Sequence, residues 1–318
     1  MRFHLLPFAP ENPAHIAAVV QCWEAACGPD LPISARFIRF NVQPWRGESC
    51  AGQLAMLDGQ LVGVVLASAL PAEPLVNPGN EGWIDAIAVL PAAQRQGIGG
   101  ALLAWATGWL RDQGCASARL GGGLRPFAVG LPVTLDSAGF FAGRGFVTFA
   151  EPCDMGANLA TYTPPPDVRE VNAAVRPAQR GQEEALLDFL RREFPGRWRY
   201  EAEEHLRLGG RISDYMLLWT EQGVEGCCVL TFGDSWRPLE RFYPYTLPKP
   251  WGQLGSVGVS AGSRGRGYGV ALLDAALRRL HNNGVNGCVI DWVRRADFYE
   301  KFGFSVYRRY LAMKRELQ

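Results

Sequence analysis

Apolar residues recur every three or four positions in four segments of the chain, which is the spacing of an amphipathic helix. The segments that predict helices are residues 12–27, 98–113, 181–194 and 268–283. A glycine directly follows the second and the fourth of them, at Gly114 and Gly284. Because glycine commonly ends helices, these two positions mark the expected helix ends.

Shorter apolar runs between these segments predict strands. The segment QLAMLDGQLVGVVLAS indicates a hairpin that turns at Asp58-Gly59, and DYMLLWTEQGVEGCCVLTF indicates another near Gln222-Gly223. Further strands are expected at 83–89, 115–120, 254–259 and 285–292. Strands that alternate with helices and hairpins predict an α/β fold built on a mixed, mostly antiparallel sheet flanked by helices.

The two halves of the chain carry these elements in the same order. The same offset separates Pro7 from Pro177 and Gly97 from Gly267, and FFAGRGF near the end of the first half matches FYEKFGF in the second. We therefore expect two copies of one domain, at residues 1–163 and 168–318. The prolines of TPPPD (residues 163–167) predict a stiff connector between them.

The first half is longer than the second before its FFAGRGF motif. The additional residues lie around GGGLRPFAVGLPVT. We expect residues 127–132 of this segment to form a loop that lines the cleft of the other half.

Composition and charge exclude several classes of protein. Hydrophobic residues make up 48% of the 318-residue chain and charged residues 20%, which is typical of a globular protein and not of a disordered one. The net charge of +1 gives no overall attraction to nucleic acid or to an acidic membrane. The longest apolar run, residues 61–72, is too short to span a bilayer, and the N-terminus does not resemble a signal peptide.

The eight cysteines are scattered and form no C-x-x-C pair, so they predict reduced thiols in a cytoplasmic protein. The four histidines are dispersed and predict no metal site.

The most informative motif is a glycine-rich turn between a predicted strand and a predicted helix. In the second half it reads R-x-x-G-x-G (residues 264–269), and in the first half Q-x-x-G-x-G (residues 94–99). Glycines let backbone N–H groups approach a ligand closely, and the start of a helix favours negative charge. The turn therefore predicts a phosphate cradle, to which Arg264 and Arg266 add cationic donors. The simpler interpretation is a structural turn, and neither the P-loop nor the dinucleotide-binding spacing is present.

The order strand, [Q/R]-x-x-G-x-G, helix, strand and short helix with F-Y-x-x-x-G-F resembles the GNAT acetyltransferase superfamily. The resemblance covers both halves and implies a tandem GNAT enzyme that uses acetyl-CoA to acetylate an amine. It implies that the cradle holds the pyrophosphate and that the pantetheine arm lies along the preceding strand. The implied cofactor residues in the second half are Val257, Gly258, Val259, Arg264, Gly265, Arg266, Gly267, Tyr268, Gly269 and Val270. Those in the first half are Ile87, Ala88, Val89, Gln94, Arg95, Gln96, Gly97, Ile98, Gly99 and Gly100.

The same resemblance separates the two halves. Tyr299 occupies the position where many GNAT enzymes carry a tyrosine that protonates the departing thiolate, whereas the first half has Phe141 there. The C-terminal half is therefore expected to be catalytic and the N-terminal half not. The alternative interpretation of Tyr299 is a packing aromatic residue.

Asp291, in the apolar strand CVIDW, is the candidate general base, because a carboxylate there is costly unless it is paired, solvated or functional. It could equally cap the short helix or pair with Arg294 or Arg295. The first half instead has Asp85 on its strand, where an acid serves as the base in some GNAT enzymes.

The segments CVIDWVRRADFYEKFGF and GLRPFAVGLP resemble tandem GNAT proteins that acetylate glucosamine and glucosaminides. This implies a small primary amine such as an amino sugar, with Trp292 and Asp85 as candidate substrate-binding residues. A protein lysine or N-terminal acetyltransferase and a non-catalytic acyl-CoA-binding module are the alternatives. The fused pair of domains is compatible with a monomer that mimics a dimer, or with a homodimer.

Overall fold

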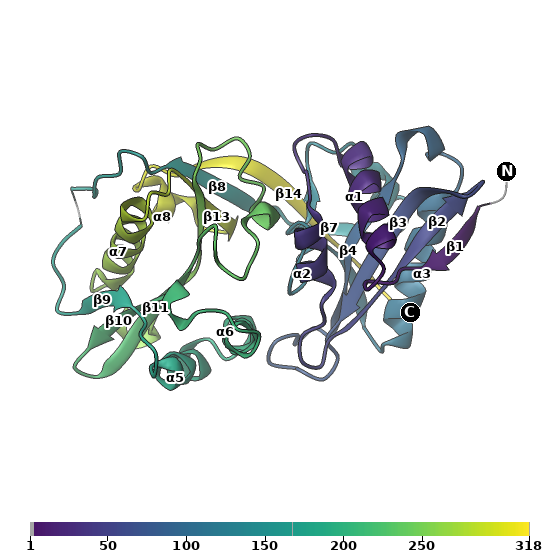
Figure 1. The fold of residues 1–318 in the computed structure, drawn as a ribbon. Helices are drawn as coiled ribbons and strands as arrows, with labels where there is room; N and C mark the ends of the chain where they lie inside the picture. The colour runs from purple at the N-terminus through teal and green to yellow at the C-terminus, as the bar shows by residue number, and fades with distance from the viewer. Residues whose placement is uncertain (1–2, 167, 318) are drawn as a thin grey trace. The chain divides into compact units, whose positions relative to one another are not determined.

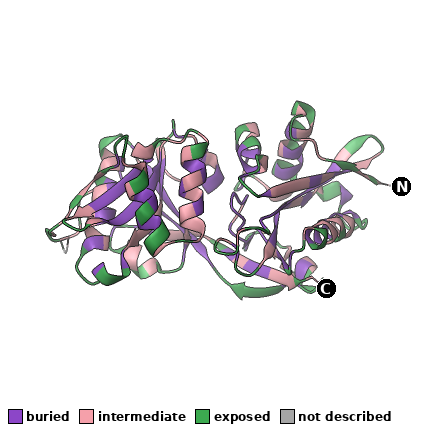
Figure 2. Cartoon of the chain, turned by 90° about the horizontal axis from the view of Figure 1, so that it is seen from below, coloured by how far each residue is buried: buried purple, intermediate pink, exposed green. Residues whose placement is uncertain are grey.

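The computed structural model describes residues 3–166 and 168–317. The chain forms two compact units: Met1–Pro152 together with Arg309–Gln318, and Cys153–Arg308 (Figure 1). Both units have the expected α/β architecture, in which helices cover a mixed sheet. Figure 2 shows buried positions along the strands and exposed positions on the outward faces of the helices.

The sheet of the first unit runs in the order β1, β2, β3, β4 and β5, followed by the C-terminal part of β14. The first four strands are antiparallel and β5 is parallel to β4. Its strands are β1 (His4–Pro7), β2 (Ser49–Leu57), β3 (Gln60–Ala69), β4 (Glu81–Val89), β5 (Ser117–Leu120), β6 (Leu131–Pro132), β7 (Val147–Ala150) and β14 (Ser305–Glu316). Its helices are α1 (Pro13–Cys27), α2 (Ala35–Val42), α3 (Ile98–Asp112) and α4 (Ala138–Ala142).

Both faces of β3 are covered, which explains its long apolar run. Val65 and Ala67 belong to the hydrophobic cluster that includes the buried face of α3. The alternating residues Val64 and Leu66 are buried as well, and α1 also contacts β3. Successive side chains of a strand point to opposite faces, so this strand is sandwiched between helical layers.

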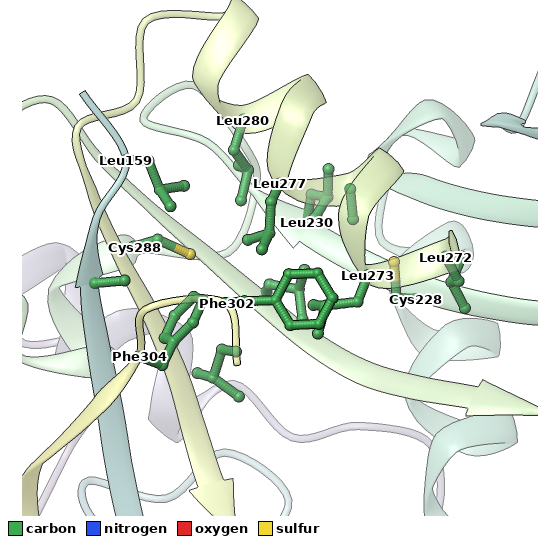
Figure 3. Packing of buried hydrophobic residues seen from close by; sticks show 14 of the residues in the cluster. Leu159, Cys228, Leu230, Leu272, Leu273, Leu277, Leu280, Cys288, Phe302 and Phe304 are labelled. Atoms are coloured by element: carbon green, nitrogen blue, oxygen red, sulfur yellow. The ribbon is translucent and has the colours of Figure 1, made fainter. Parts of the chain in front are cut away.

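The second unit repeats this arrangement. Strands β9, β10, β11 and β12 are antiparallel, β13 is parallel to β12, and β8 closes the sheet against β13. These strands are β8 (Cys153–Asn158), β9 (Ala174–Pro177), β10 (Tyr215–Thr220), β11 (Gly223–Thr231), β12 (Trp251–Val259) and β13 (Gly287–Val293). The helices are α5 (Glu183–Glu193), α6 (Arg197–Arg207), α7 (Tyr268–Asn282) and α8 (Ala296–Glu300). Helix α7 packs its leucine face into the core shown in Figure 3.

The compact units divide the chain differently from the predicted halves at 1–163 and 168–318. Strand β8 follows the first GNAT copy in sequence, yet it pairs with β13 and lies in the second unit. Strand β14 ends the second copy, yet its residues from Arg309 lie in the first unit, where they pair with β5, β6 and β7. Each unit therefore takes its last strand from the other copy.

The predicted connector at residues 163–167 consequently follows a strand that already lies in the second unit. Just before the connector, the Tyr162 hydroxyl donates a hydrogen bond to Asp274 of α7, at 2.8 Å. Asp167, the last residue of the predicted connector, lies outside the described residues.

The additional segment of the first half packs within its own unit. Phe127 is 1% exposed, and its ring lies 5.2 Å from that of Trp23 on α1 and 5.0 Å from that of Phe37 on α2. That residues 127–132 also line the cleft of the other half stays a prediction. Two buried aromatic neighbours hold Phe127 in the first unit.

We expect Phe127→Ala to destabilise the chain by about 3–5 kcal/mol, because it leaves a cavity between two helices and the sheet. The matched control is Phe149→Ala on β7, where the side chain is 45% exposed and contacts the Arg119 guanidinium; its loss should not exceed about 1 kcal/mol. Urea unfolding of both variants measures the difference. Equal losses would contradict a structural role for the additional segment.

Candidate functional site

The glycine-rich turn of the second unit opens α7 in the conformation of an anion cradle. A short 3-10 turn (Ala261–Ser263) leads from β12 into it, and Gly265 and Gly267 both take left-handed backbone angles, with φ of 78° and 82°. Residues 264–267 are exposed. Within the described chain, no side chain caps the start of α7. The first N–H groups of this helix are therefore available to a ligand.

The first unit repeats this turn. A 3-10 turn (Pro91–Ala93) leads into α3, and Gly97 has a φ of 84°. Arg95 takes a φ of 62° at the position of Gly265, although a left-handed angle costs a non-glycine residue roughly 1–2 kcal/mol. The shared geometry, kept against this cost, indicates a common function. A phenylalanine lies against the next glycine in both units, Phe140 against Gly99 and Phe298 against Gly269. The surroundings differ in that Phe140 also carries the Arg144 guanidinium on its ring.

In both units, the strand before the turn has an open edge. Strands β12 and β13 pair only over residues 251–253 of β12. Beyond this point, Gly258 and Val259 pair with β11 alone among the described strands. Strands β4 and β5 likewise pair only over residues 81–84. An extended ligand can add to such an edge through backbone hydrogen bonds, so the predicted cofactor residues form one continuous surface of open strand and turn.

Asp291 stands where β12 and β13 separate. Its carboxylate accepts a hydrogen bond of 2.9 Å from the Gln253 side chain, whose carbonyl oxygen accepts one of 2.8 Å from the Thr231 hydroxyl. Gln253 and Thr231 are buried, whereas Asp291 is half-buried. This chain fixes the carboxylate with an oxygen available for other partners. Asp291 does not pair with Arg295, which instead binds Asp297.

Tyr299, on α8, combines packing with proximity to Asp291. Its ring lies 5.1 Å from Phe298 and joins the edge of the hydrophobic core, as the alternative interpretation predicted. Burial, followed by the charges of Cys228 and Asp291, raises the pKa of Tyr299 to about 12. The phenol is therefore protonated at neutral pH and can donate a hydrogen bond.

Beside Asp291, the Trp292 backbone is strained, with a φ of 56°. Its N–H donates to the buried Asp154 carboxylate at 2.9 Å, which supports this conformation. The Arg197 guanidinium of α6 lies 4.5 Å from the centre of the Trp292 ring and also pairs with Glu201. The half-buried indole is thus held between the sheet and α6.

Three residues near Asp291 escaped the sequence interpretation: Gln253, Glu201 and Arg241. Burial acts to raise the pKa of Glu201, but Arg197, Arg237 and Arg241 together hold it below its usual value. Burial and the charge of Arg237 lower the pKa of Arg241, against the opposing charges of Asp291 and Glu201. A cluster of charged side chains, Arg197, Glu201, Arg237 and Arg241, therefore lies near Asp291. The spacing of Arg197, Glu201 and His205 along one face of α6 was the signal available in the sequence.

The first unit has a different arrangement beside its open strand. Asp85 lies beneath the additional segment, where a Cβ on Gly123 would come within 2.7 Å of its carboxylate. From this segment the buried Arg125 pairs with the buried Glu48 and lies 4.6 Å from the Trp45 ring. Burial, with a smaller contribution from Glu48, raises the pKa of Asp85 to about 8, although Ser68 and Arg125 act in the opposite direction.

The order of the strands and the two glycine-rich turns that start α3 and α7 agree with the family resemblance seen in the sequence. The model of the acetyltransferase (GNAT) family matches residues 18–126 and 183–304, and the chain belongs to this family. As a member of this family, the chain is an acetyltransferase, and acetyl-CoA is the acetyl donor of the family. The cradles and open strand edges fit the pyrophosphate and the extended arm of this donor.

Solved structures support the tandem fold. The glucosamine N-acetyltransferase region of a fungal multi-domain β-N-acetylglucosaminidase is 23% identical, with a TM-score of 0.88, over 98% of this chain and 38% of that one. A tandem GNAT protein from the clavulanic acid biosynthesis pathway is 15% identical, with a TM-score of 0.72, over 100% and 99%. A GNAT enzyme from Sphaerobacter thermophilus is 19% identical, with a TM-score of 0.69, over 99% and 96%. Among curated proteins, none matches this sequence.

Over residues 3–166 and 168–317, no group of three or more histidine, cysteine, aspartate or glutamate side chains is placed to hold a metal ion. No helix in the same residues is long and apolar enough to cross a membrane.

Asp85→Asn should change how stability depends on pH. The unfolded chain loses the Asp85 proton near pH 3.8 and the folded chain near pH 8, so folding retains a proton between these values. Wild-type stability should therefore fall as the pH rises through this window, and the variant should lose that part of the slope. Melting temperatures at pH 5 and pH 8.5 measure it, with exposed Asp58→Asn as the control. If the melting temperatures of Asp85→Asn and wild type change equally with pH, Asp85 does not retain its proton in the folded chain.

Proposed function

We propose that the second unit transfers the acetyl group of acetyl-CoA to the primary amine of a small molecule, an amino sugar such as glucosamine. One observation carries this proposal: Asp291 lies close enough to Tyr299 for its charge to raise the pKa of the phenol. Both residues belong to the unit whose open strand edge and cradle are described above. The first unit keeps the cradle but has the buried Phe141 in place of the tyrosine.

The proposed reaction requires an uncharged amine to attack the thioester carbon. Asp291, held by Gln253, accepts the proton that the amine loses as the C–N bond forms. The C–S bond then breaks, and the CoA thiolate leaves. Because the pKa of Tyr299 is about 12, we expect this phenol to stabilise the developing thiolate by donating a hydrogen bond without giving up its proton. The thiolate takes its proton from solvent.

The neighbourhood of Asp291 suits a polyhydroxylated amine. Trp292 offers an aromatic surface to the apolar face of a sugar ring. Glu201 and Arg241 offer charged acceptors and donors for hydroxyl groups. The fold of the fungal glucosamine N-acetyltransferase region gives further support to this choice.

The acceptor class is tested by measuring free-thiol release across amino sugars, polyamines, aminoglycosides and peptides. Preference for an amino sugar supports the proposal. Preference for a peptide would instead indicate a protein acetyltransferase, and acetyl-CoA affinity without turnover on any amine would indicate a binding module.

For the first unit, we propose binding of the cofactor without transfer. Its turn shares the left-handed positions of the catalytic copy, while the additional segment covers Asp85. Two cofactor molecules would then bind to each chain, and only one would react.

Tyr299→Phe should reduce kcat by about 10- to 100-fold, because it removes one hydrogen bond to the leaving thiolate. The affinity for acetyl-CoA should stay within twofold of wild type, as measured by calorimetry. Phe298→Leu, which alters the neighbouring ring and leaves the phenol in place, is the packing control. Unchanged turnover in Tyr299→Phe would remove the phenol from the mechanism.

Gly267→Val and Gly97→Val form a matched pair, because both glycines start a helix with nearly the same left-handed angle. A β-branched side chain is strained there and covers the N–H groups. We expect each variant to lose one of two cofactor sites by calorimetry, and only Gly267→Val to lose acetyl transfer. Loss of transfer in Gly97→Val, with its melting temperature intact, would contradict the assignment of catalysis to the second unit.

A further inference from the structure

We propose that a buried network centred on Asp214 is a positioning device for the acceptor side of the site. It joins the start of β10 to the loop after β11, and this loop carries Arg237 and Arg241. The inference rests on the proposed function, since it assigns Arg241 and Glu201 to the acceptor.

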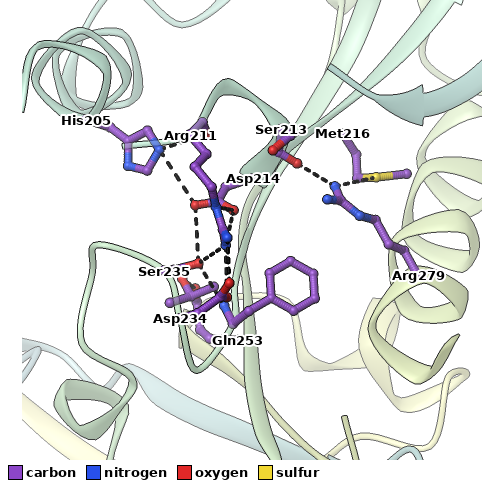
Figure 4. Close-up of polar contacts among 11 residues, drawn as sticks. His205, Arg211, Ser213, Asp214, Met216, Asp234, Ser235, Gln253 and Arg279 are labelled. Atoms are coloured by element: carbon purple, nitrogen blue, oxygen red, sulfur yellow. Dashed lines mark hydrogen bonds and ion pairs between the residues drawn. The ribbon is translucent and has the colours of Figure 1, made fainter. Parts of the chain in front are cut away.

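The network begins with the Asp214 carboxylate, which is 1% exposed (Figure 4). One of its oxygens accepts from the Arg211 Nε at 3.1 Å and pairs with an Arg211 terminal nitrogen at 3.0 Å. Its other oxygen accepts a hydrogen bond of 3.2 Å from the Ser235 hydroxyl. Arg211 thus satisfies one oxygen of the buried carboxylate, and Ser235, from the loop, donates to the other, which lies 3.9 Å from the His205 Nε2.

The same arginine holds the loop a second time. Arg211 binds Asp234 with both terminal nitrogens, at 2.6 and 3.0 Å, which is a bidentate pair. The Ser235 hydroxyl also accepts from the Phe232 N–H at 3.0 Å and so closes the turn at the start of the loop. Residues 234–235 are thus fixed to Arg211 and Asp214, just before β10, by several directional contacts.

Helix α6 meets the loop on the other side. The ring of His205 lies 6.1 Å from that of Trp236, and a His205 nitrogen lies 3.1 Å from the Arg211 carbonyl oxygen. One turn earlier on the same face of α6 stands Glu201, whose pKa reports the charges of Arg237 and Arg241. The network therefore fixes Ser235 and Trp236 of the loop. The same loop and α6 carry Arg241 and Glu201, the charged side chains near Asp291.

This arrangement predicts a selective kinetic effect. A shift of residues 234–236 would move Arg237 and Arg241, which follow within a few residues on the same loop. The cradle and Tyr299 lie on α7 and α8. Arg279 of α7 donates a hydrogen bond of 2.6 Å to the Ser213 carbonyl oxygen, but the cradle lies at the opposite end of this helix and should keep its geometry. Loosening the network should impair acceptor binding and spare the cofactor.

The test compares Ser235→Ala and Asp214→Asn with the control Asp188→Asn, which breaks an exposed ion pair with Arg191 on α5. We expect the acceptor KM to rise about tenfold in the first two variants, equivalent to about 1.4 kcal/mol. The acetyl-CoA affinity by calorimetry should remain within twofold. Ser235→Thr, which retains the hydroxyl, should restore most of the acceptor affinity.

The outcomes separate the two proposals. An active wild type whose Ser235→Ala variant keeps its acceptor KM, or loses acceptor and cofactor affinity equally, would overturn the positioning role. A fall in melting temperature with unaltered kinetics would overturn it as well, because that is the result of a purely structural network. Absence of transfer by the wild type over the whole amine panel would overturn the proposed function and this inference together. If Asp214→Asn does not fold, Ser235→Ala alone decides.

Discussion

The separation of two parallel strands is the constraint on which the second unit depends. Strands β12 and β13 pair for three residues and then part, although the sheet continues on both sides. Backbone groups on the open edge must bind water or a ligand. The same separation places Asp291 at the point of divergence and leads β12 into the turn that starts α7. The open edge, the carboxylate and the cradle are thus consequences of one break in strand pairing.

The two copies share this break and differ in what surrounds it. In the second unit, Gln253 on the neighbouring strand donates a hydrogen bond to Asp291, and α6 adds the charged side chains of Arg197 and Glu201. In the first unit, the additional segment brings Arg125 and Phe127 into the interior, where they pack with residues of its own helices and strands. The backbone angles of the glycine-rich turn are alike in the two units. The side chains around Asp85 and Asp291 differ.

Local sequence signals predicted the parts of the fold that depend on local physics. The four helices expected from apolar spacing are present as α1, α3, α5 and α7, and the left-handed angles at Gly97 and Gly267 agree with their glycines. Helix α6 was missed because most of its positions are arginine or glutamate, and its buried residues include Glu204 and His205 beside only Tyr200 and Ala202. The pairing of Gln253 with Asp291 joins residues distant in sequence, so no periodicity indicates it. The exchange of β8 and β14 was missed for the same reason.

Because of that exchange, each unit needs a strand from the other copy to complete its sheet. Lys314 of β14 pairs with Arg119 of β5, so the first unit lacks a strand until β14 has been made. During synthesis, the sheet of the N-terminal copy is therefore complete only after the second copy has been made, whereas vectorial folding of independent domains imposes no such delay. The loop closed by this pairing is long, and the entropy lost in closing it makes the final strand a late event. Removal of residues 314–316 of β14 would thus destabilise the N-terminal copy, although it is made first.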